Sequence, residues 1–380
     1  MFKLTITTWF NTIGTQMGHI AKIKDIYEGL QVRLHKNPIG APRAKVLYQI
    51  LRLLYDKDEA FIASNFPLGR ATLTDLVKAT GMEREVLEEK LEVMARKGQV
   101  VDYSKPGARL YFLAPTMIGL FEFTFMRVRE DIPQKELASL LHQYFREGGM
   151  GKEVFGSKTQ RTRTLIHEGA LPHSEVFPYD RAFQMIKDYK GGAVTMCYCR
   201  HTAQHRGEAC DAPVDNVCTS FGMAADFLIR RGFARRASME ELIDILQMAE
   251  DLGLVHVCDN VRDRNSFVCH CCGCCCELLA GINELRIPHA VAPSRYIANV
   301  DPFLCEGCGA CAERCPIHAI TTEDGKAVVD DNFCLGCGVC TSACSNHAMN
   351  MSAREDPTPI PRNWLGLMKR ISAEKGRLLR

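Results

Sequence analysis

The first 196 residues of this 380-residue chain contain no cysteine, and all 19 cysteines lie between Cys197 and Cys344. The first half of the chain therefore offers no thiol for a metal ion or a disulfide. The total is odd, and six cysteines crowd into residues 269–276, where adjacent thiols are poor disulfide partners. This pattern disfavours a disulfide framework and makes metal binding the leading interpretation.

A long apolar run, an excess of charge of one sign and an export signal are also missing. The longest apolar stretch, PTMIGLFEFTFM, has about half the length needed to cross a bilayer and contains Glu122. The formal net charge is +2, so no general affinity for polyanions follows. The N-terminal residues MFKLTITTWFNTIG have one lysine and no small-residue cleavage site. We expect a cytoplasmic chain without a transmembrane segment.

The chain also lacks a dinucleotide-binding glycine fingerprint, an evident nucleophile motif and a flavin signature. Hydrophobic residues make up 46% of it and charged residues 24%, as in ordinary globular proteins. Its length allows two or three separate cores. The function therefore has to be inferred from the cysteines and from the elements that carry them.

Residues 43–115 are predicted to form three helices followed by a β-hairpin. The helix of VLYQILRLLY has an apolar stripe, and those of TLTDLVKAT and EREVLEEKLEVMARKG are expected to end at Gly81 and Gly98. QVVDY and ARLYFLA flank the turn SKPG, which is typical of a hairpin. This order resembles a winged helix. The helix that would read DNA, Glu83 to Lys97, has five acids and four bases, so nucleic-acid binding is not expected and protein docking is favoured.

Two short runs near the C-terminal end repeat the same cysteine spacing. Residues 305–315 read CEGCGACAERC and residues 334–344 read CLGCGVCTSAC, so each run is C-x2-C-x2-C-x3-C. Three closely spaced thiolates in a glycine-rich loop suit three irons of a cubane, and the fourth cysteine of each run is expected to reach the other cluster. Zinc sites close with two pairs of ligands and do not show this duplication, so zinc is disfavoured here.

The repeated spacing predicts two ligand sets. One 4Fe–4S cluster is expected on Cys305, Cys308, Cys311 and Cys344. The other cluster is expected on Cys334, Cys337, Cys340 and Cys315. Residues 299–352 resemble a bacterial two-cluster ferredoxin, and the resemblance implies transfer of single electrons at low potential. The second run ends in Cys344-Ser345 instead of Cys-Pro, which is expected to loosen the turn around the fourth ligand without removing it.

The charges around these two runs are mostly negative. Residues 301–350 contain seven acids and two bases, a local charge of −5 before any cluster is counted. An acidic face would suit docking to a basic patch on a redox partner protein, such as a reductase, a dehydrogenase or a ferredoxin-dependent enzyme. The alternative is that these acids only solvate the surface.

The segment CHCCGCCC holds six cysteines in eight positions. The spacing of the ferredoxin-like runs recurs at Cys269, Cys272 and Cys275. The other candidate ligands are Cys258, Cys271, Cys274 and Cys276. We expect a further iron–sulfur cluster here. The surplus thiols would permit an unusual cluster, an exchange of ligands or a substrate site; alternatively, some of them only donate hydrogen bonds or fill space.

Upstream, CYCRHTAQHRGEAC followed by DAPVDNVC brings four more cysteines into one segment. They are Cys197, Cys199, Cys210 and Cys218. An iron–sulfur cluster is the preferred interpretation; structural zinc and free buried thiols are the alternatives, because zinc accepts such spacings too. Arg200 and His201 are expected to offset the charge of a thiolate-bound cofactor.

Two helical segments complete the pattern. The helix MEELIDILQMAEDL, capped by Ser238 with Glu241 and ended by Gly253, precedes a strand LVHV and is expected to be a scaffold between the cysteine groups. The tail NWLGLMKRISAEKGRLLR is predicted to be an amphipathic helix that docks on a partner or on the protein itself, a membrane surface being the weaker alternative.

These features together predict a multidomain α+β protein. Its expected parts are a helical extension (1–42), a winged-helix-like domain (43–115), a mixed domain with cysteine-rich metal sites (116–298), a two-cluster ferredoxin domain (299–352) and a helical tail (353–380). The combination resembles cysteine-rich ferredoxin-type iron–sulfur proteins of anaerobic bacteria and archaea. That resemblance implies electron transfer. The supply of thiols predicts up to four 4Fe–4S clusters, because eight cysteines serve the ferredoxin-like domain and eleven remain, with zinc as an alternative at 197–218.

The expected function is a relay of single low-potential electrons between a donor and a reductase or dehydrogenase in anaerobic metabolism. Such a chain would act as an electron-transfer protein or as a subunit of an oxidoreductase complex. Two alternatives stay open. One is a reductase with a catalytic or substrate-binding cluster at 269–276, and the other is a redox-sensing winged-helix regulator.

Overall fold

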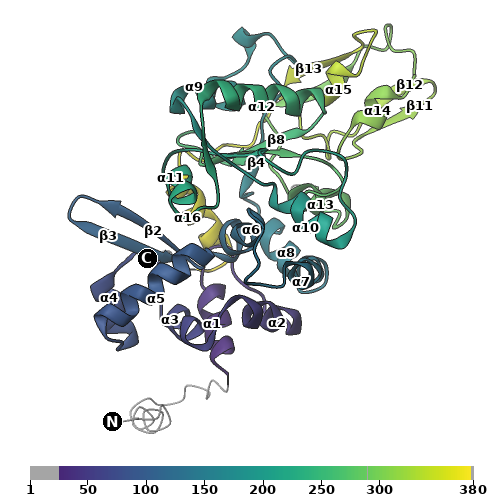
Figure 1. Ribbon diagram of the computed structural model, residues 1–380. Helices are drawn as coiled ribbons and strands as arrows, with labels where there is room; N and C mark the ends of the chain where they lie inside the picture. Colours follow the sequence, from purple (N-terminus) through teal and green to yellow (C-terminus); the bar gives the residue numbers. More distant parts are fainter. Residues whose placement is uncertain (1–24, 289, 378–380) are drawn as a thin grey trace, which may run out of the picture.

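The computed structural model describes residues 25–288 and 290–377 (Figure 1), and it contains both helices and strands, as an α+β chain requires. Of the expected N-terminal extension, residues 1–24 lie outside the described residues. The remainder contains one helix, α1 (Ile26–His35). Within the described residues, no helix is both long enough and apolar enough to cross a membrane.

The predicted helices and hairpin of residues 43–115 are present. They are α2 (Lys45–Leu54), α4 (Leu73–Thr80), α5 (Arg84–Lys97), β2 (Val100–Lys105) and β3 (Ala108–Leu113). Two elements were not predicted, the helix α3 (Lys57–Ser64) and the short strand β1 (Ala71–Thr72), which extends the hairpin into a sheet of order β1-β3-β2. The winged-helix interpretation of this unit stays a prediction.

Local capping explains where these helices begin and end. The Thr72 hydroxyl accepts a hydrogen bond from the Asp75 amide, and the Asp75 carboxylate accepts one from the Thr72 amide, so α4 starts with a reciprocal cap. Helix α5 ends at Gly98 with φ 79°, where an added Cβ would lie 2.6 Å from Phe123 Cβ. Only glycine fits both the left-handed backbone and this contact.

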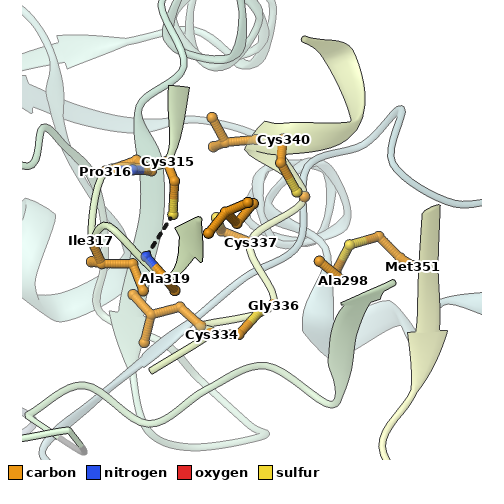
Figure 2. Close-up of a pocket in the computed structure, with 14 residues that line it drawn as sticks. Ala298, Cys315, Pro316, Ile317, Ala319, Cys334, Gly336, Cys337, Cys340 and Met351 are labelled. Atoms are coloured by element: carbon orange, nitrogen blue, oxygen red, sulfur yellow. Dashed lines mark hydrogen bonds between the residues drawn. The ribbon is translucent and has the colours of Figure 1, made fainter. Parts of the chain in front are cut away.

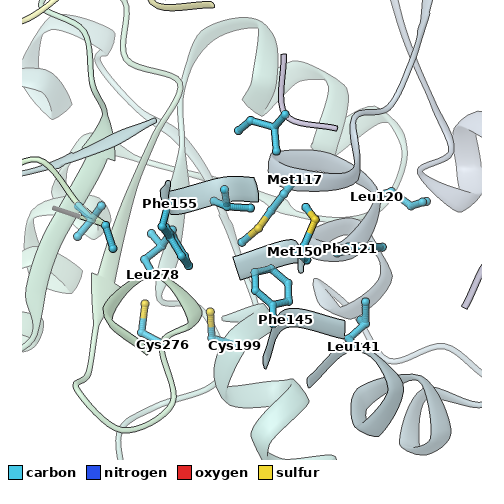
Figure 3. Packing of buried hydrophobic residues seen from close by; sticks show 14 of the residues in the cluster. Met117, Leu120, Phe121, Leu141, Phe145, Met150, Phe155, Cys199, Cys276 and Leu278 are labelled. Carbon is cyan, nitrogen blue, oxygen red and sulfur yellow. The ribbon is translucent and has the colours of Figure 1, made fainter. Parts of the chain in front are cut away.

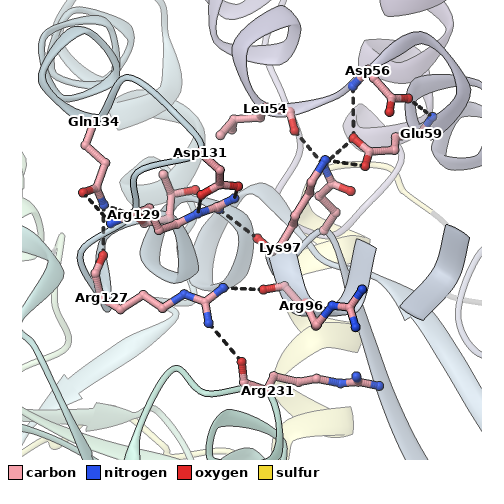
Figure 4. Close-up of polar contacts among 12 residues, drawn as sticks. Leu54, Asp56, Glu59, Arg96, Lys97, Arg127, Arg129, Asp131, Gln134 and Arg231 are labelled. Atoms are coloured by element: carbon pink, nitrogen blue, oxygen red, sulfur yellow. Dashed lines mark hydrogen bonds and ion pairs between the residues drawn. The ribbon is translucent and has the colours of Figure 1, made fainter. Parts of the chain in front are cut away.

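An arginine network joins the first part of the chain to the next (Figure 4). The Arg127 guanidinium donates hydrogen bonds to the carbonyls of Arg96, at 2.5 Å, and Arg231, at 3.1 Å. The buried Asp102 on β2 accepts from Arg231 at 2.9 Å and from Arg230 at 3.1 Å. Because a buried carboxylate is costly unless it is paired, these bonds hold the hairpin firmly against the following domain.

The longest apolar stretch of the sequence forms the core between these two parts. It makes the irregular turn η2 (Thr116–Leu120) and the helix α6 (Phe121–Phe125), which pack with α7 (Gln134–Arg146) and α8 (Met150–Phe155). Figure 3 shows Met117, Phe121, Phe145 and Met150 in this core, with Cys199 and Cys276 at its edge. The apolar run thus covers part of the cysteine-rich region.

A six-stranded antiparallel sheet forms the middle of the molecule. Its order is β4 (Thr162–Thr164), β8 (Val255–Asp259), β9 (Phe267–Cys271), β6 (Cys218–Ser220), β5 (Gly192–Thr195) and β7 (Arg235–Ala237). Helices α9 (Ala182–Tyr189) and α12 (Met239–Asp251) cover one face (Figure 1). The turns η3 (His173–Glu175) and η4 (Pro178–Asp180) precede α9. Of the predicted capping box of α12, the Ser238 hydroxyl accepts from the Glu241 amide, while the Glu241 carboxylate forms an ion pair with Arg235.

The remaining helices and strands form the cysteine-rich lobe and connect it to the sheet. Near the sheet lie α10 (Tyr198–Arg206), α11 (Gly222–Arg230) and α13 (Glu277–Asn283). The C-terminal lobe contains β10 (Tyr296–Val300), α14 (Ala310–Arg314), β11 (Ile320–Glu323), β12 (Lys326–Val329), α15 (Val339–Ser342) and β13 (Met349–Ala353). Strand β10 pairs antiparallel with β13, and β11 pairs with β12.

The tail helix α16 (Trp364–Glu374) docks on the protein itself. Leu367, Met368 and Ile371 are buried against Val261. Trp364 and Leu365 were expected on the same apolar face, but they are 49% and 54% exposed. The next residues, Lys375 and Arg377, form ion pairs with Glu153 of α8, and their hydrogen bonds outweigh burial and lower the pKa of Glu153 to about 2. Residues 378–380 of the predicted tail lie outside the described residues.

Candidate metal centres

Two cavities lie between the repeated cysteine runs, and each is lined by three cysteines of one run and one of the other. The cavity in Figure 2 is lined by Cys334, Cys337, Cys340 and Cys315. The second cavity is lined by Cys305, Cys308, Cys311 and Cys344. The pairing of β10 with β13 brings the two ends of the lobe together. The structure therefore brings together the same two sets of four cysteines that the spacing groups, and their role as cluster ligands stays a prediction.

Backbone amides point at the sulfurs in both halves of the repeat. The Ala319 amide donates to Cys315 Sγ at 3.3 Å, and the Ala348 amide donates to Cys344 Sγ at 3.2 Å. The Ala327 amide donates to Cys305 Sγ at 3.4 Å, and this bond lowers the pKa of the Cys305 thiol. Such donors favour the thiolate form that binds metals.

The turn after the fourth cysteine is the same in both runs, although only the first has a proline. The His318 amide donates to the Cys315 carbonyl at 3.2 Å, and the His347 amide donates to the Cys344 carbonyl at 3.1 Å. His318 and His347 have positive φ angles of 54° and 51°. The loosening expected at Cys344-Ser345 is therefore not observed.

The loop after β9 forms the first of two further thiol groups. The four-thiol group consists of Cys210, Cys272, Cys274 and Cys275, whose sulfurs all lie within 4.8 Å of one another. Cys210 Sγ is 3.7 Å from Cys272 Sγ, and Cys274 Sγ is 3.6 Å from Cys275 Sγ. The Cys210 amide also donates to Cys275 Sγ at 3.4 Å. Cys274 is exposed, so the group reaches the surface.

The second group consists of neighbouring thiols that are buried or half-buried. The six-thiol group consists of Cys197, Cys199, Cys218, Cys269, Cys271 and Cys276. Cys218 Sγ lies 3.9 Å from Cys269 Sγ on the neighbouring strand. Hydrogen bonds from Cys218 and Cys271 lower the pKa of Cys269 to about 5. Hydrogen bonds from Cys199 and Cys271 likewise lower the pKa of Cys276.

The structure assigns the cysteines to these two groups differently from the sequence analysis, which grouped them by their order along the chain. The sequence placed Cys197, Cys199, Cys210 and Cys218 in one site and the cysteines of 269–276 in another. In the structure Cys210 joins the 272–275 loop, and the other three join Cys269, Cys271 and Cys276. The reason is strand geometry: Cys269 and Cys271 point to one face of β9, the chain then turns away, and it returns at Cys276 to start α13.

Two predicted site residues lie elsewhere. Cys258 is paired in register with Val268, so its side chain is on the opposite sheet face from Cys269. It packs in the apolar core under α12, and burial raises its pKa to about 12. His201, expected near a cofactor, instead bonds through Nδ1 to the Phe125 carbonyl at 2.8 Å. Neither residue faces the thiol groups.

Arg200 lies between the two thiol groups, as its expected role requires. The guanidinium is almost completely buried and donates to the carbonyls of Pro213 and His270, both at 2.6 Å. Burial disfavours its charge, but the thiols of Cys197 and Cys272 more than offset this and raise the pKa of Arg200. It is thus a fixed positive charge facing one cysteine of each group.

The ferredoxin-like lobe touches the cysteine loop directly. The side-chain Nδ2 of Asn283 donates hydrogen bonds to the Gly273 carbonyl at 2.9 Å and to the Pro316 carbonyl at 3.0 Å. Gly273 lies in the four-thiol loop, and Pro316 follows the cluster ligand candidate Cys315. Gly273 approaches so closely that an added Cβ would lie 2.2 Å from the Pro316 oxygen. The four-thiol loop and the ferredoxin-like lobe are therefore in direct contact.

A set of buried histidines lies on the other side of this junction. His167, Glu250 and His256 bring one potential ligand atom each within 4.8 Å of one another. All three side chains already form hydrogen bonds within the chain. His167 Nε2 contacts the Leu254 carbonyl at 2.8 Å, and His256 Nδ1 contacts His270 Nδ1 at 2.9 Å. Glu250 accepts a hydrogen bond from the Glu168 amide at 2.8 Å. The His167 amide also donates to the Cys337 carbonyl at 2.9 Å. These bonds tie the ferredoxin-like lobe to α12 and β8.

Two buried polar groups beside the six-thiol group were missed by the sequence analysis as site residues. Glu122 Oε2 accepts from the Gly119 amide at 2.6 Å, while Oε1 has no partner, and burial raises its pKa to about 7. The Tyr198 hydroxyl is also buried without a partner, near Cys199 and Glu122. One signal was visible in the sequence, because Glu122 is the only acid in the longest apolar run.

The donor sets fit metals better than free thiols. Ten cysteines in two adjacent groups are mostly buried, and Arg200 is the one cation shown facing both of them within the described residues. Thiolates packed this closely repel one another unless a metal neutralises them. Soft sulfur ligands suit iron–sulfur clusters and zinc.

Comparison with known protein families identifies one domain. Residues 297–345 match the family model of the 4Fe-4S dicluster domain. This match contains all eight cysteines that line the two cavities described above and supports iron–sulfur clusters in the C-terminal lobe. No curated protein and no solved structure shows significant similarity to the chain.

Proposed function

We propose that this chain carries electrons between a redox partner, which docks at the dicluster domain, and a third iron–sulfur cluster held by the six-thiol group. The dicluster domain itself is typical of iron–sulfur electron transfer. The observation that carries the proposal further is the contact of Gly273 with Pro316, because it places the dicluster domain against the cysteine-rich loop. Electron tunnelling falls steeply with distance, so direct contact favours a continuous path.

The outer end of this path is the cavity of Cys305, Cys308, Cys311 and Cys344. Cys308 is exposed, whereas Cys337 and Cys340 of the other cavity are covered by more protein. Phe303 is 95% exposed and Leu304 is 50% exposed beside the outer cavity. Exposed aromatic residues at the centre of a polar surface are typical contact points for a partner protein. We assign partner docking to this end.

The charge of the dicluster domain suits a basic partner. Six acids of residues 301–350 are exposed, namely Glu306, Glu313, Glu323, Asp324, Asp330 and Asp331. The two basic residues of this region form hydrogen bonds to backbone carbonyls of the chain. Arg314 donates to the Asp251 carbonyl, and Lys326 donates to the Cys305 carbonyl, both at 2.6 Å. An exposed apolar side chain on an acidic domain favours a partner that offers an apolar contact together with lysine or arginine side chains.

The inner end of the path is the six-thiol group. Its thiols are buried or half-buried, and within the described residues no three of its sulfurs gather as tightly as those of the four-thiol group. Cys218 Sγ and Cys269 Sγ are 3.9 Å apart, but the six thiols together are spread too far to close on one ion, and they can enclose a cluster of several irons. Bound there, an iron–sulfur cluster would store or pass single electrons. Arg200 contributes a positive charge that lowers the energy of an anionic centre.

The N-terminal part is proposed as a second protein-docking unit. On α5 the exposed charged residues are Glu83 at its N-terminal boundary, Arg84, Glu85, Glu88, Glu89 and Arg96. The two lysines of the helix pair with acids of α3, Lys90 with Asp58 and Lys97 with Glu59. A surface with this acidic excess repels phosphate, so a DNA-reading regulator is disfavoured.

A second candidate function is reduction of a substrate at the six-thiol group. The buried Glu122 and Tyr198 favour it, because unpartnered polar atoms beside a metal centre can bind or protonate a substrate. Electron paramagnetic resonance of the reduced protein with small exogenous ligands separates the two functions. A shift of the six-thiol signal would support substrate reduction, and unchanged signals would support the relay.

A redox titration of anaerobically purified protein tests the proposal. We expect at least three separate one-electron signals, and Cys271→Ala should remove one of them and leave the two of the dicluster domain. Cys258→Ala is the control, because this thiol belongs to neither group and lies on the opposite sheet face. Two signals only, with no effect of Cys271→Ala, would refute the third cluster.

A further inference from the structure

The spacing of the sulfurs separates the thiol groups into two kinds. In the four-thiol group all four sulfurs lie within 4.8 Å of one another, with pairs at 3.6 and 3.7 Å. The two ligand sets of the dicluster domain line cavities instead, and within the described residues their sulfurs do not gather in this way. Because the sulfurs of the four-thiol group lie closer together than those of the dicluster domain, we expect the two kinds of site to bind different metal centres.

A single zinc ion requires the compact arrangement. Zinc binds sulfur at about 2.3 Å, so the four sulfurs of a tetrahedral site lie about 3.8 Å apart. The observed pairs are close to this value, as is the single pair of Cys218 and Cys269, but within the described residues only the four-thiol group gathers four sulfurs within 4.8 Å of one another. A cubane instead places several irons and sulfides between its ligands and pushes the protein sulfurs farther apart. The four-thiol group has room for one ion and not for a cluster.

The surroundings also fit a closed structural site. The four ligands come from two segments, one at Cys210 and one at the loop 272–275, so an ion would join α10 and its following loop to β9. Ala203, Ala249 and Leu254 pack against the group, and the Cys210 amide donates to Cys275 Sγ. A set of four thiolates leaves no open position for substrate.

We propose that Cys210, Cys272, Cys274 and Cys275 bind one zinc ion that holds the loop between the dicluster domain and the six-thiol group. This proposal refines the metal assignment of the proposed relay without depending on a third cluster. Zinc has one oxidation state in proteins, so the loop would stay fixed while electrons pass on either side. Gly273, which contacts Pro316, lies inside this loop.

Metal analysis of single-cysteine variants tests the site. The wild-type protein should keep one zinc per chain after dialysis against a chelator, and Cys274→Ala should keep none, while its iron and sulfide stay unchanged. Cys274 is the best position, because it is exposed and its truncation removes little packing. Cys258→Ala, a buried cysteine outside both groups, should keep zinc and iron like the wild type.

X-ray absorption at the zinc edge of the wild-type protein gives a second test that needs no variant. Four sulfurs at about 2.3 Å are expected. Nitrogen and oxygen at about 2.0–2.1 Å would place the zinc at His167, Glu250 and His256 and overturn the proposal. Loss of iron and sulfide from Cys274→Ala, or the absence of zinc from the wild type, would also overturn it. Iron and redox signals report on the relay separately, so the two proposals can fail independently.

Discussion

Replacing Gly273 by alanine tests whether the dicluster domain and the cysteine loop must touch for electrons to pass between them. The added Cβ would lie 2.2 Å from the Pro316 oxygen, whereas real contacts essentially never fall below 3.0 Å, so the two segments must separate by at least 0.8 Å. This shift also stretches the two bonds from Asn283 that join them, now 2.9 and 3.0 Å. Overpacking of this kind costs about 1–3 kcal/mol, which leaves the protein folded.

The assay mixes the protein rapidly with a reductant that reacts at the exposed cluster site of Cys308. It then measures the rate at which the signal of the reduced six-thiol group appears. We expect a slower inner phase in Gly273→Ala, with iron, sulfide and equilibrium potentials unchanged. Gly169→Ala is the matched control, because an added Cβ there meets no atom within 4 Å. The role assigned to this contact would be refuted if the six-thiol group were reduced at the same rate in the wild type, Gly273→Ala and Gly169→Ala while Gly273→Ala showed a measured loss of stability.

The remaining predictions concern the dicluster domain, its docking surface and the tail. Cys344→Ala should remove between one and four irons from the cluster of Cys305, and iron analysis with electron paramagnetic resonance should show the other cluster intact; damage confined to the 334–340 set would contradict the cross-ligation. Phe303→Ala should change stability by less than about 0.5 kcal/mol but raise the KM for the redox partner in a coupled assay, and an unchanged KM would place docking elsewhere. Leu367→Ala should lower the free energy of unfolding in urea by about 2–5 kcal/mol, because the side chain is fully buried, while iron content stays constant; loss of iron would show that α16 belongs to the metal core.

The helices with strong local signals could be predicted from the sequence. Helix α4 has Thr72 at its start and Gly81 at its end, and α5 has Leu87 and Leu91 on its buried side. Both were placed within a residue or two. The short helix α3 was missed because only eight residues and a cap mark it. The order of the six-stranded sheet joins segments as distant as β4 and β8, and no local pattern records such pairing.

The residues of the candidate site also fall into those that local spacing predicts and those that depend on tertiary structure. The cysteines of the dicluster domain follow a repeated local spacing, so the sequence could anticipate that Cys315 and Cys344 each line the cavity of the other run. The other cysteines are grouped by the face of β9 from which they project, and this depends on tertiary structure. Cys258 illustrates the difference, since its position in the chain suggested a ligand but its strand register turns it away.

Determination of iron, zinc and acid-labile sulfide in protein purified without oxygen tests the central claim most directly. If the six-thiol group binds a third cluster beside the dicluster domain, iron and sulfide should be equal and clearly above eight per chain, near twelve for three cubanes. Both should fall to about eight in Cys271→Ala. Eight irons in the wild type, with Cys271→Ala unchanged, would leave the dicluster domain as the redox element and contradict a relay into the middle of the molecule.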